Sequence, residues 1–282
     1  MPSVFELITV SESLSKLLLT SPDHARAEIY LHGAHLTSWI PVGGEEQLFL
    51  SHKSEFHAGA AIRGGVPIIF PQFSSRGPFM RHGFARVSAW DFAGAETVTN
   101  NAVAATFRLR DSDATRKIWP YSFLAEFVVT LEGHRLEMNF TVMNTDTQPF
   151  SFTAALHTYF RVMEVGQVEI ENLNGVRYHD QVNGKDEVET TALVKFDNEV
   201  NRIYFNTPPH LILHEGDRIL DIHATGFTDT VVWNPGALNS AALADLEVEG
   251  HRRFVCLEAA AIGTPVQLAP NESWRGTQTL SI

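Results

Sequence analysis

The sequence contains little cysteine, little lysine and no long apolar run. Its single cysteine, Cys256, cannot form an internal disulfide, which favours a reducing compartment and makes the cytoplasm the expected location. No stretch of about 18 apolar residues is present, so we expect no membrane-spanning helix. The formal net charge of −12 argues against nucleic acid and anionic membrane surfaces as partners, because both attract basic faces.

Motifs of several common enzyme classes are also missing. We find no glycine-rich phosphate loop ahead of a helix, no GxSxG elbow and no CxxC pair, which disfavours dinucleotide enzymes, P-loop enzymes and the usual serine hydrolases. Among the thirteen histidines, neither His32 with His35 nor His52 with His57 has a spacing that brings metal ligands together on a strand or loop. We therefore predict no metal centre.

What the sequence does contain is strand after strand with a period of two, separated by turn residues. Residues 136–142 alternate strictly between apolar and polar, and they should pair with residues 127–131 across a short turn. Helical periodicity over more than two turns is hard to find. We predict an all-β fold, a large antiparallel β-sandwich, as a single domain over residues 1–282. Further strands are expected around 107–109, at 211–214, at 218–222 and at 274–282.

Arginine outnumbers lysine sixteen to five, and four of the arginines lie between Arg63 and Arg86. That segment contains no aspartate or glutamate. A locally cationic stretch in an acidic protein indicates a site for a small anion, and the rigid fork of arginine suits phosphate or carboxylate. The alternative is a solvated loop whose charges bind nothing.

Two ionisable residues lie in otherwise apolar runs. His157 stands in an aromatic-rich stretch at 152–160, predicted to be one strand, and Glu258 is followed by three alanines. An ionisable group in such a run needs a partner or a water-filled cleft, because burying it alone is costly. Each could be a satisfied structural residue, but together they could form an acid–base pair. Cys256, by contrast, has the setting of a small buried apolar residue.

Five stretches in order along the chain resemble one known family. They are Gly33–Trp39, Arg63–Pro71, His82–Arg86, His157–Phe160, and Asp229–Pro235 leading to Val255–Glu258. Together they resemble the hexose-6-phosphate mutarotase branch of the aldose-epimerase superfamily, the glucose-6-phosphate 1-epimerases. This resemblance implies a galactose-mutarotase-like β-sandwich with a substrate cleft and no required cofactor.

The resemblance also implies roles for single residues. His157 and Glu258 match the catalytic histidine and glutamate of the family. The residues implied in substrate binding are Arg63, Arg81, His82, Arg86, Asn201 and Asp229. Asn201 departs from the family, which usually has aspartate there; asparagine keeps one acceptor, loses the charge and gains donors, so the choice of sugar is open.

The predicted function is therefore the interconversion of the α and β anomers of a hexose 6-phosphate, most simply glucose 6-phosphate. Glu258 would act as the base toward O1–H and His157 as the acid toward the ring oxygen O5, with the roles exchanged on ring closure. Two alternatives stay open: an aldose 1-epimerase for an unphosphorylated sugar, and a non-catalytic sugar-phosphate-binding protein on the same fold.

Overall fold

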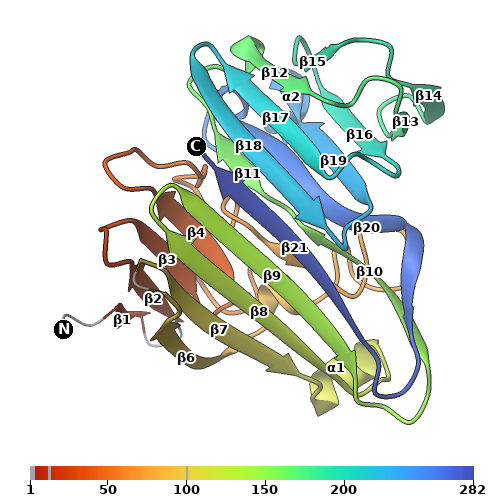
Figure 1. The fold of residues 1–282 in the computed structure, drawn as a ribbon. Helices are drawn as coiled ribbons and strands as arrows, with labels where there is room; N and C mark the ends of the chain where they lie inside the picture. The colour runs from red at the N-terminus through yellow and green to blue at the C-terminus, as the bar shows by residue number, and fades with distance from the viewer. Residues whose placement is uncertain (1–3, 12–13, 100) are drawn as a thin grey trace.

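The computed structural model describes residues 4–11, 14–99 and 101–282; residues 1–3, 12–13 and 100 of the predicted domain lie outside this description. Its architecture is almost entirely antiparallel β-sheet, with a nine-stranded sheet in front of an eight-stranded one in Figure 1. The predicted all-β sandwich is therefore confirmed. None of the helices in the described ranges combines the length and hydropathy needed to cross a bilayer.

The strands fall into three sheets. The nine-stranded sheet has the order β15 (Leu193–Lys195), β12 (Val168–Glu171), β17 (His210–Glu215), β18 (Arg218–Thr225), β21 (Ser273–Ser281), β9 (Arg135–Asn144), β8 (Phe123–Glu132), β7 (Val103–Arg110) and β6 (Asp91–Thr97). The eight-stranded sheet has the order β14 (Lys185–Val188), β13 (Arg177–Asp180), β16 (Val200–Tyr204), β19 (Asp229–Asn234), β20 (Phe254–Leu268), β10 (Phe150–Leu156) and β5 (Ile68–Ile69), with β11 (Tyr159–Arg161) also paired to β20. The smallest sheet contains β1 (Phe5–Ser11), β2 (Leu14–Thr20), β3 (Arg26–Tyr30) and β4 (His35–Ile40).

Helical segments are short. They are α1 (Asp113–Ile118), α2 (Gly236–Ser240) and 3-10 turns at Ala85–Val87, Val165–Gln167 and Gly250–Arg253. The Ser112 side chain caps α1 by accepting a hydrogen bond from the Thr115 amide. The scarcity of helix agrees with the absence of helical periodicity in the sequence.

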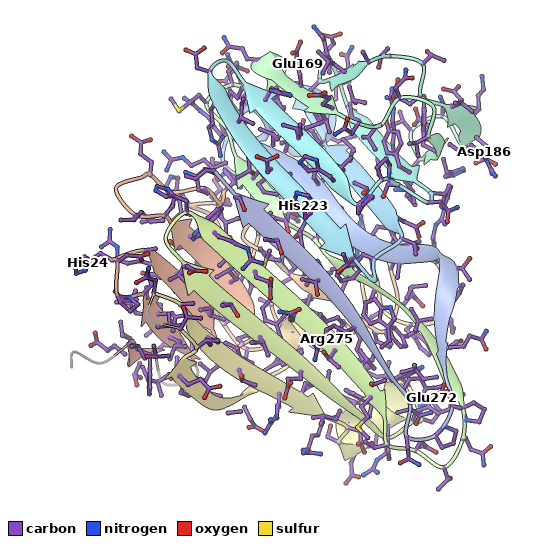
Figure 2. The ribbon with its side chains drawn as sticks, in the orientation of Figure 1. His24, Glu169, Asp186, His223, Glu272 and Arg275 are labelled. Atoms are coloured by element: carbon purple, nitrogen blue, oxygen red, sulfur yellow. The ribbon has the colours of Figure 1, made fainter. Side chains whose placement is uncertain are left out.

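The predicted strands around 107–109, at 127–131, 136–142, 211–214 and 218–222, and at 274–282 are all present. Apart from exposed Arg135 at the start of β9, side chains of β8 and β9 alternate between buried and half-buried, as the period of two requires. The inward side chains pack into the main core, while polar side chains such as His223 of β18 and Arg275 of β21 cover the outer face (Figure 2).

Strand β20 is buried on both faces, because every residue from Phe254 to Ile262 is buried. Leu257, Ala259 and Ala261 belong to the main core shared with the nine-stranded sheet. Ala260 and Ile262 belong to a second apolar cluster. Alternation along a strand puts Glu258 on the same face as this second cluster, away from the nine-stranded sheet.

The stretch at 152–160 is not the single strand that the sequence predicts. β10 ends at Leu156 and β11 begins at Tyr159, so His157 lies in the break between them. The His157 amide donates to the carbonyl of Pro67 at 3.0 Å instead of continuing the ladder with β20. The break frees the His157 side chain from the regular pleat.

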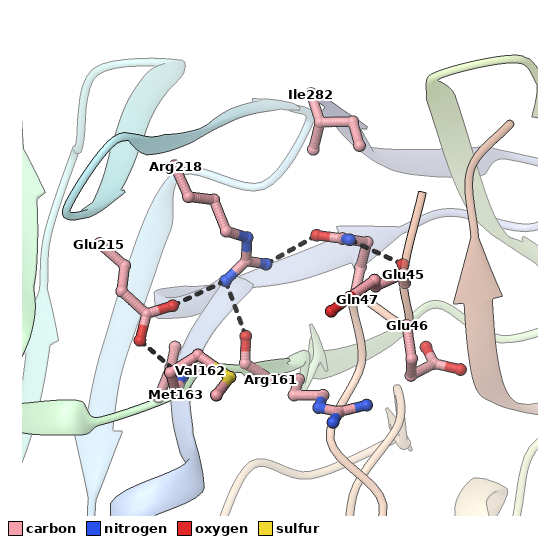
Figure 3. Close-up of a pocket in the computed structure, with 9 residues that line it drawn as sticks. All are labelled: Glu45, Glu46, Gln47, Arg161, Val162, Met163, Glu215, Arg218 and Ile282. Carbon is pink, nitrogen blue, oxygen red and sulfur yellow. Dashed lines mark hydrogen bonds and ion pairs between the residues drawn. The ribbon is translucent and has the colours of Figure 1, made fainter. Parts of the chain in front are cut away.

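A charged node centred on Arg218 ties the hairpin of β17 and β18 to β11 and to the segment between β4 and β5 (Figure 3). The Arg218 guanidinium donates to Glu215 at 3.2 Å, to the Arg161 carbonyl at 2.9 Å and to Gln47 Oε1 at 2.7 Å. Glu215 in turn accepts from the Met163 amide at 2.6 Å. These polar groups satisfy one another, so we interpret the pocket they line as structural.

Candidate functional site

A pocket of about 160 Å³ lies on the face of the eight-stranded sheet that points away from the main core. It is covered by the arginine-rich segment 63–86. Seven of the eight residues singled out from the sequence line it: Arg63, Arg81, His82, Arg86, Asn201, His157 and Glu258. Residues that are nearly 200 positions apart in the chain therefore meet in one cavity.

Strand register brings His157 and Glu258 together. Leu156 of β10 pairs with Ala259 of β20, so the next position on each strand sets His157 opposite Glu258. His157 Nε2 lies 3.2 Å from Glu258 Oε1, and the two side chains are only 10% and 2% exposed. Two ionisable groups that looked unrelated in the sequence form a direct pair.

Each member of this pair has one polar atom without a partner. His157 Nδ1 and Glu258 Oε2 are buried and make no hydrogen bond within the described residues. Buried polar atoms are nearly always satisfied, so two orphans in one cavity indicate groups kept for a ligand.

Burial dominates the electrostatics of the pair. It lowers the pKa of His157 well below the usual value, and repulsion from His82 when that ring is protonated, and from Arg86 and Arg63, lowers it further. Burial raises the pKa of Glu258 well above its usual value, against the opposing effect of Arg86 and Arg81. Both charged forms are therefore disfavoured without ligand, and the two groups, being in contact, titrate as a unit that holds one shared proton between its two titration steps.

His82 is a neutral hydrogen-bond donor facing the pair. Its Nδ1 accepts from the Ser74 amide at 3.3 Å, which leaves the proton on Nε2, and its ring meets the His157 ring edge-to-face at 5.7 Å. Burial, followed by the charges of three arginines, lowers the pKa of His82 to about 3. The next residue, Gly83, allows the chain to pass close to Phe70 because it has no side chain; a Cβ there would lie 2.1 Å from the Phe70 carbonyl oxygen.

The arginines of the 63–86 segment differ in what they contact. Arg63 is already neutralised, because it forms an ion pair with Asp245 at 3.0 Å and donates to the Tyr159 hydroxyl at 3.0 Å. Among the described residues, Arg86 has a buried Nε without a partner and donates only to the carbonyl of Arg81, at 3.2 Å. Neither Arg81 nor Arg86 forms an ion pair with any residue in the described ranges. The uncompensated positive charge of the pocket therefore comes from these two residues.

Asp229 does not reach the pocket. Its carboxylate accepts from the amides of Ile262 at 2.8 Å, Gly263 at 2.7 Å and Asn206 at 3.2 Å. These contacts tie the start of β19 to β20. The side chain implied in substrate binding thus accepts three hydrogen bonds from backbone amides, and its role toward a sugar stays a prediction.

Other residues in or beside the pocket were not singled out from the sequence, and four of them have polar or aromatic side chains that contact the site: Tyr159, Trp233, Gln181 and Asp245. Tyr159 and Trp233 lie within recognised motifs, so the motifs themselves could have pointed to them. Gln181 donates to Asn201 Oδ1 at 2.5 Å, and Asp245 pairs with Arg63. No local pattern marks Gln181 or Asp245, because their partners are 20 and 182 residues away.

Within the described ranges, no three His, Cys, Asp or Glu side chains are grouped as ligands of one ion would be. Cys256 is free and buried, and burial raises the pKa of its thiol well above the usual value. The groups that face the pocket are donors, a carboxylate and aromatic rings, which suit a polar organic anion.

Comparison with known proteins identifies relatives over the whole chain. Residues 15–281 match the family model described as aldose 1-epimerase. A protein from Cenchrus ciliaris with the provisional name glucose-6-phosphate 1-epimerase is 37% identical over 100% of this chain and 89% of its own length. One from Salmonella typhimurium with the same provisional name is 35% identical over 94% of this chain and 90% of its own.

Solved structures agree. The crystal structure of a provisionally named mutarotase from Salmonella typhimurium superposes with a TM-score of 0.91 at 32% identity, over 100% of this chain and 94% of that one. Family model, relatives and fold coincide over nearly the same residues. The chain therefore belongs to the aldose 1-epimerase family.

Proposed function

We propose that this protein, an isomerase by its family, interconverts the α and β anomers of a hexose 6-phosphate, with glucose 6-phosphate as the main candidate. The observation that carries the proposal is the buried contact between His157 and Glu258 beside two arginines that have no carboxylate partner among the described residues. The provisional names of the relatives support the same substrate class.

The chemistry follows from the arrangement of the sugar. The O1 hydroxyl and the ring oxygen O5 are both bonded to C1, so the base and the acid must lie close together, as the 3.2 Å contact allows. Glu258 takes the proton from O1–H, His157 gives a proton to O5, and the C1–O5 bond breaks to leave an aldehyde. Rotation about C1–C2 and the reverse proton transfers close the ring on the other face of the aldehyde.

Substrate binding must favour the charged form of the pair, in which Glu258 is ionised and His157 is protonated. This form arises when the one proton of the pair passes from Glu258 to His157, so no proton has to be taken from solvent. The positive charges of Arg86 and Arg81 favour ionised Glu258. A well-placed acid or base of this kind contributes about 10²- to 10⁴-fold to the rate.

Phosphate binding is assigned to Arg81 and Arg86. A phosphate between them would use the orphaned Nε of Arg86 and compensate two like charges. Arg63, which the resemblance also implied in binding, already has Asp245 as its counter-ion. The hydrogen-bonded side chains of Gln181 and Asn201 would contact sugar hydroxyls. Asn201 is there a neutral replacement for the aspartate usual in the family.

The principal alternative is an epimerase for an unphosphorylated aldose. That interpretation expects the arginines to pair with the protein's own carboxylates. Arg63 does so, whereas Arg81 and Arg86 pair with none in the part of the chain that the structure describes. A pure sugar-phosphate binder is less well supported, because binding needs neither an acid nor a base. The cytoplasmic location and the absence of nucleic-acid partners stay predictions.

One experiment separates these functions. Anomer exchange is measured by NMR saturation transfer on glucose, galactose and their 6-phosphates. Exchange that is fastest on a 6-phosphate supports the proposal. Faster exchange on the free sugars would establish the unphosphorylated substrate, and binding without exchange would establish a binding protein.

A further inference from the structure

We propose that Asp245 is a positioning residue for the acid–base pair, acting through Arg63 and Tyr159; this inference rests on the proposed function. Asp245 lies in the segment between α2 and β20. Neither the family motifs recognised in the sequence nor the proposed chemistry assigns it a role. Its importance follows from a chain of contacts that ends on the ring of His157.

The first contact is a two-point ion pair. Arg63 donates through Nε to Asp245 Oδ2 at 3.1 Å and through a terminal nitrogen to Oδ1 at 3.1 Å. Two parallel hydrogen bonds fix the plane of the guanidinium as well as its position. The two side chains are 21% and 25% exposed, so the pair is only partly screened by solvent.

The second contact passes from Arg63 to Tyr159. The remaining terminal nitrogen of Arg63 donates to the Tyr159 hydroxyl at 3.0 Å. The ring of Tyr159 is buried and stacks on the ring of His157, with centroids 4.9 Å apart and planes at 11°. A shift of the guanidinium therefore moves the surface against which the imidazole of His157 rests.

Asp245 is itself anchored. The Ser51 hydroxyl lies 2.7 Å from the Asp245 carbonyl oxygen and 2.5 Å from a carboxylate oxygen of Glu247. Leu243, in the same segment, lines the pocket. The segment is thus fastened to the loop that precedes Arg63, which makes Asp245 a fixed reference point for the guanidinium.

Asp245 also controls charge. The titratable and charged groups that face the pair come from each element packed against it: Arg63, Arg81, His82 and Arg86 from the covering segment, and Tyr159 from β11. With Asp245 present, Arg63 is compensated and only Arg81 and Arg86 attract phosphate. Without its carboxylate, Arg63 becomes a third uncompensated cation beside His157.

This predicts an unusual combination of effects for Asp245→Asn. The displaced guanidinium and tyrosine misplace the imidazole, so kcat on glucose 6-phosphate should fall about ten- to a hundredfold. The released positive charge should leave the KM for glucose 6-phosphate unchanged or lower it. Both limbs of the pH–rate profile should move to lower pH, because an added cation disfavours every protonated form of the pair.

Two variants serve as comparisons. Tyr159→Phe removes the hydroxyl that accepts from Arg63 but keeps the ion pair between Arg63 and Asp245. It should therefore lower kcat without shifting the pH–rate profile. Glu126→Gln removes the carboxylate partner of Arg108, at 2.9 Å on paired strands β7 and β8, and should change neither kcat nor KM. An Asp245→Asn variant with normal kcat, or with reduced kcat, raised KM and an unshifted profile, would overturn the proposal.

A measurement without turnover separates this inference from the proposed function. The imidazole nitrogens of His157 are followed by NMR across a pH titration in the ligand-free protein. Asp245→Asn should change the His157 signals and lower its titration midpoint, whether or not glucose 6-phosphate is a substrate. Unchanged His157 signals refute the positioning role, whereas absence of anomer exchange in the wild type refutes only the proposed function.

Discussion

Replacing Arg86 with alanine tests the phosphate assignment most directly. Arg86 has a buried Nε without a partner and no ion pair in the described parts of the chain. A hydrogen bond to a charged group contributes about 1.5–3 kcal/mol net, so losing it should raise the KM for glucose 6-phosphate roughly ten- to a hundredfold. Because Arg86 also donates to the Arg81 carbonyl, its truncation frees the loop that carries Arg81, which favours the upper end of that range.

The assay is anomer exchange on glucose 6-phosphate and on glucose, followed by NMR saturation transfer. Glucose has no phosphate to lose, so its slow exchange should be scarcely changed in Arg86→Ala. Arg86→Lys should recover only part of the affinity, since the ammonium keeps the charge but lacks the fork. The matched control is Arg76→Ala, which removes an exposed arginine of the same acid-free segment that does not line the pocket.

Two results would refute this reasoning. If Arg76→Ala raises KM as much as Arg86→Ala does, the effect comes from the net charge of the segment and not from a contact with phosphate. If the wild type prefers glucose or galactose to their 6-phosphates, Arg86 has another role.

Three further predictions concern the pair and the fold. His157→Ala and Glu258→Gln should each abolish most anomer exchange while the far-UV circular dichroism stays that of the wild type; near-normal exchange in either variant would remove that residue from the mechanism. The pH–rate profile should be bell-shaped, and the bell should be broader than a glutamate and a histidine with their ordinary pKa values of about 4.3 and 6.5 would give. Burial lowers the pKa of His157, so the pair gains a second proton only at lower pH, and it raises that of Glu258, so the shared proton is lost only at higher pH. Limbs at the ordinary values would contradict this. Arg218→Met leaves buried Glu215 without its cation, so it should lower the free energy of unfolding, measured by urea titration, by about 1–3 kcal/mol. The kcat should not change. A variant as stable as the wild type would show that the charged node does not stabilise the fold.

The sequence alone determined the fold class and the identity of the principal residues. Alternation in stretches such as 127–142 requires two-faced strands, and short turns force neighbouring strands to pair, so the hairpins follow from local chemistry. An acid-free, arginine-rich segment and two ionisable residues in apolar runs are also local features. They were enough to single out Arg86, His157 and Glu258, with the family resemblance supplying the roles.

Only the tertiary structure decided how these residues are used. The break at His157, and the register that sets it opposite Glu258, depend on pairings across the eight-stranded sheet. Which arginines are charge-compensated depends on Asp245, which pairs with Arg63 from 182 residues away.

Asp229 also shows that the sequence does not reveal which partner a side chain meets. Its motif resembles that of the family, yet its carboxylate accepts hydrogen bonds from backbone amides of β20 and of the loop between β16 and β17. A local pattern encodes which face a side chain occupies, because that depends on the strand's own period. Which partner it meets depends on the register and closure of whole sheets, and these are set by the packing of residues far away in the chain.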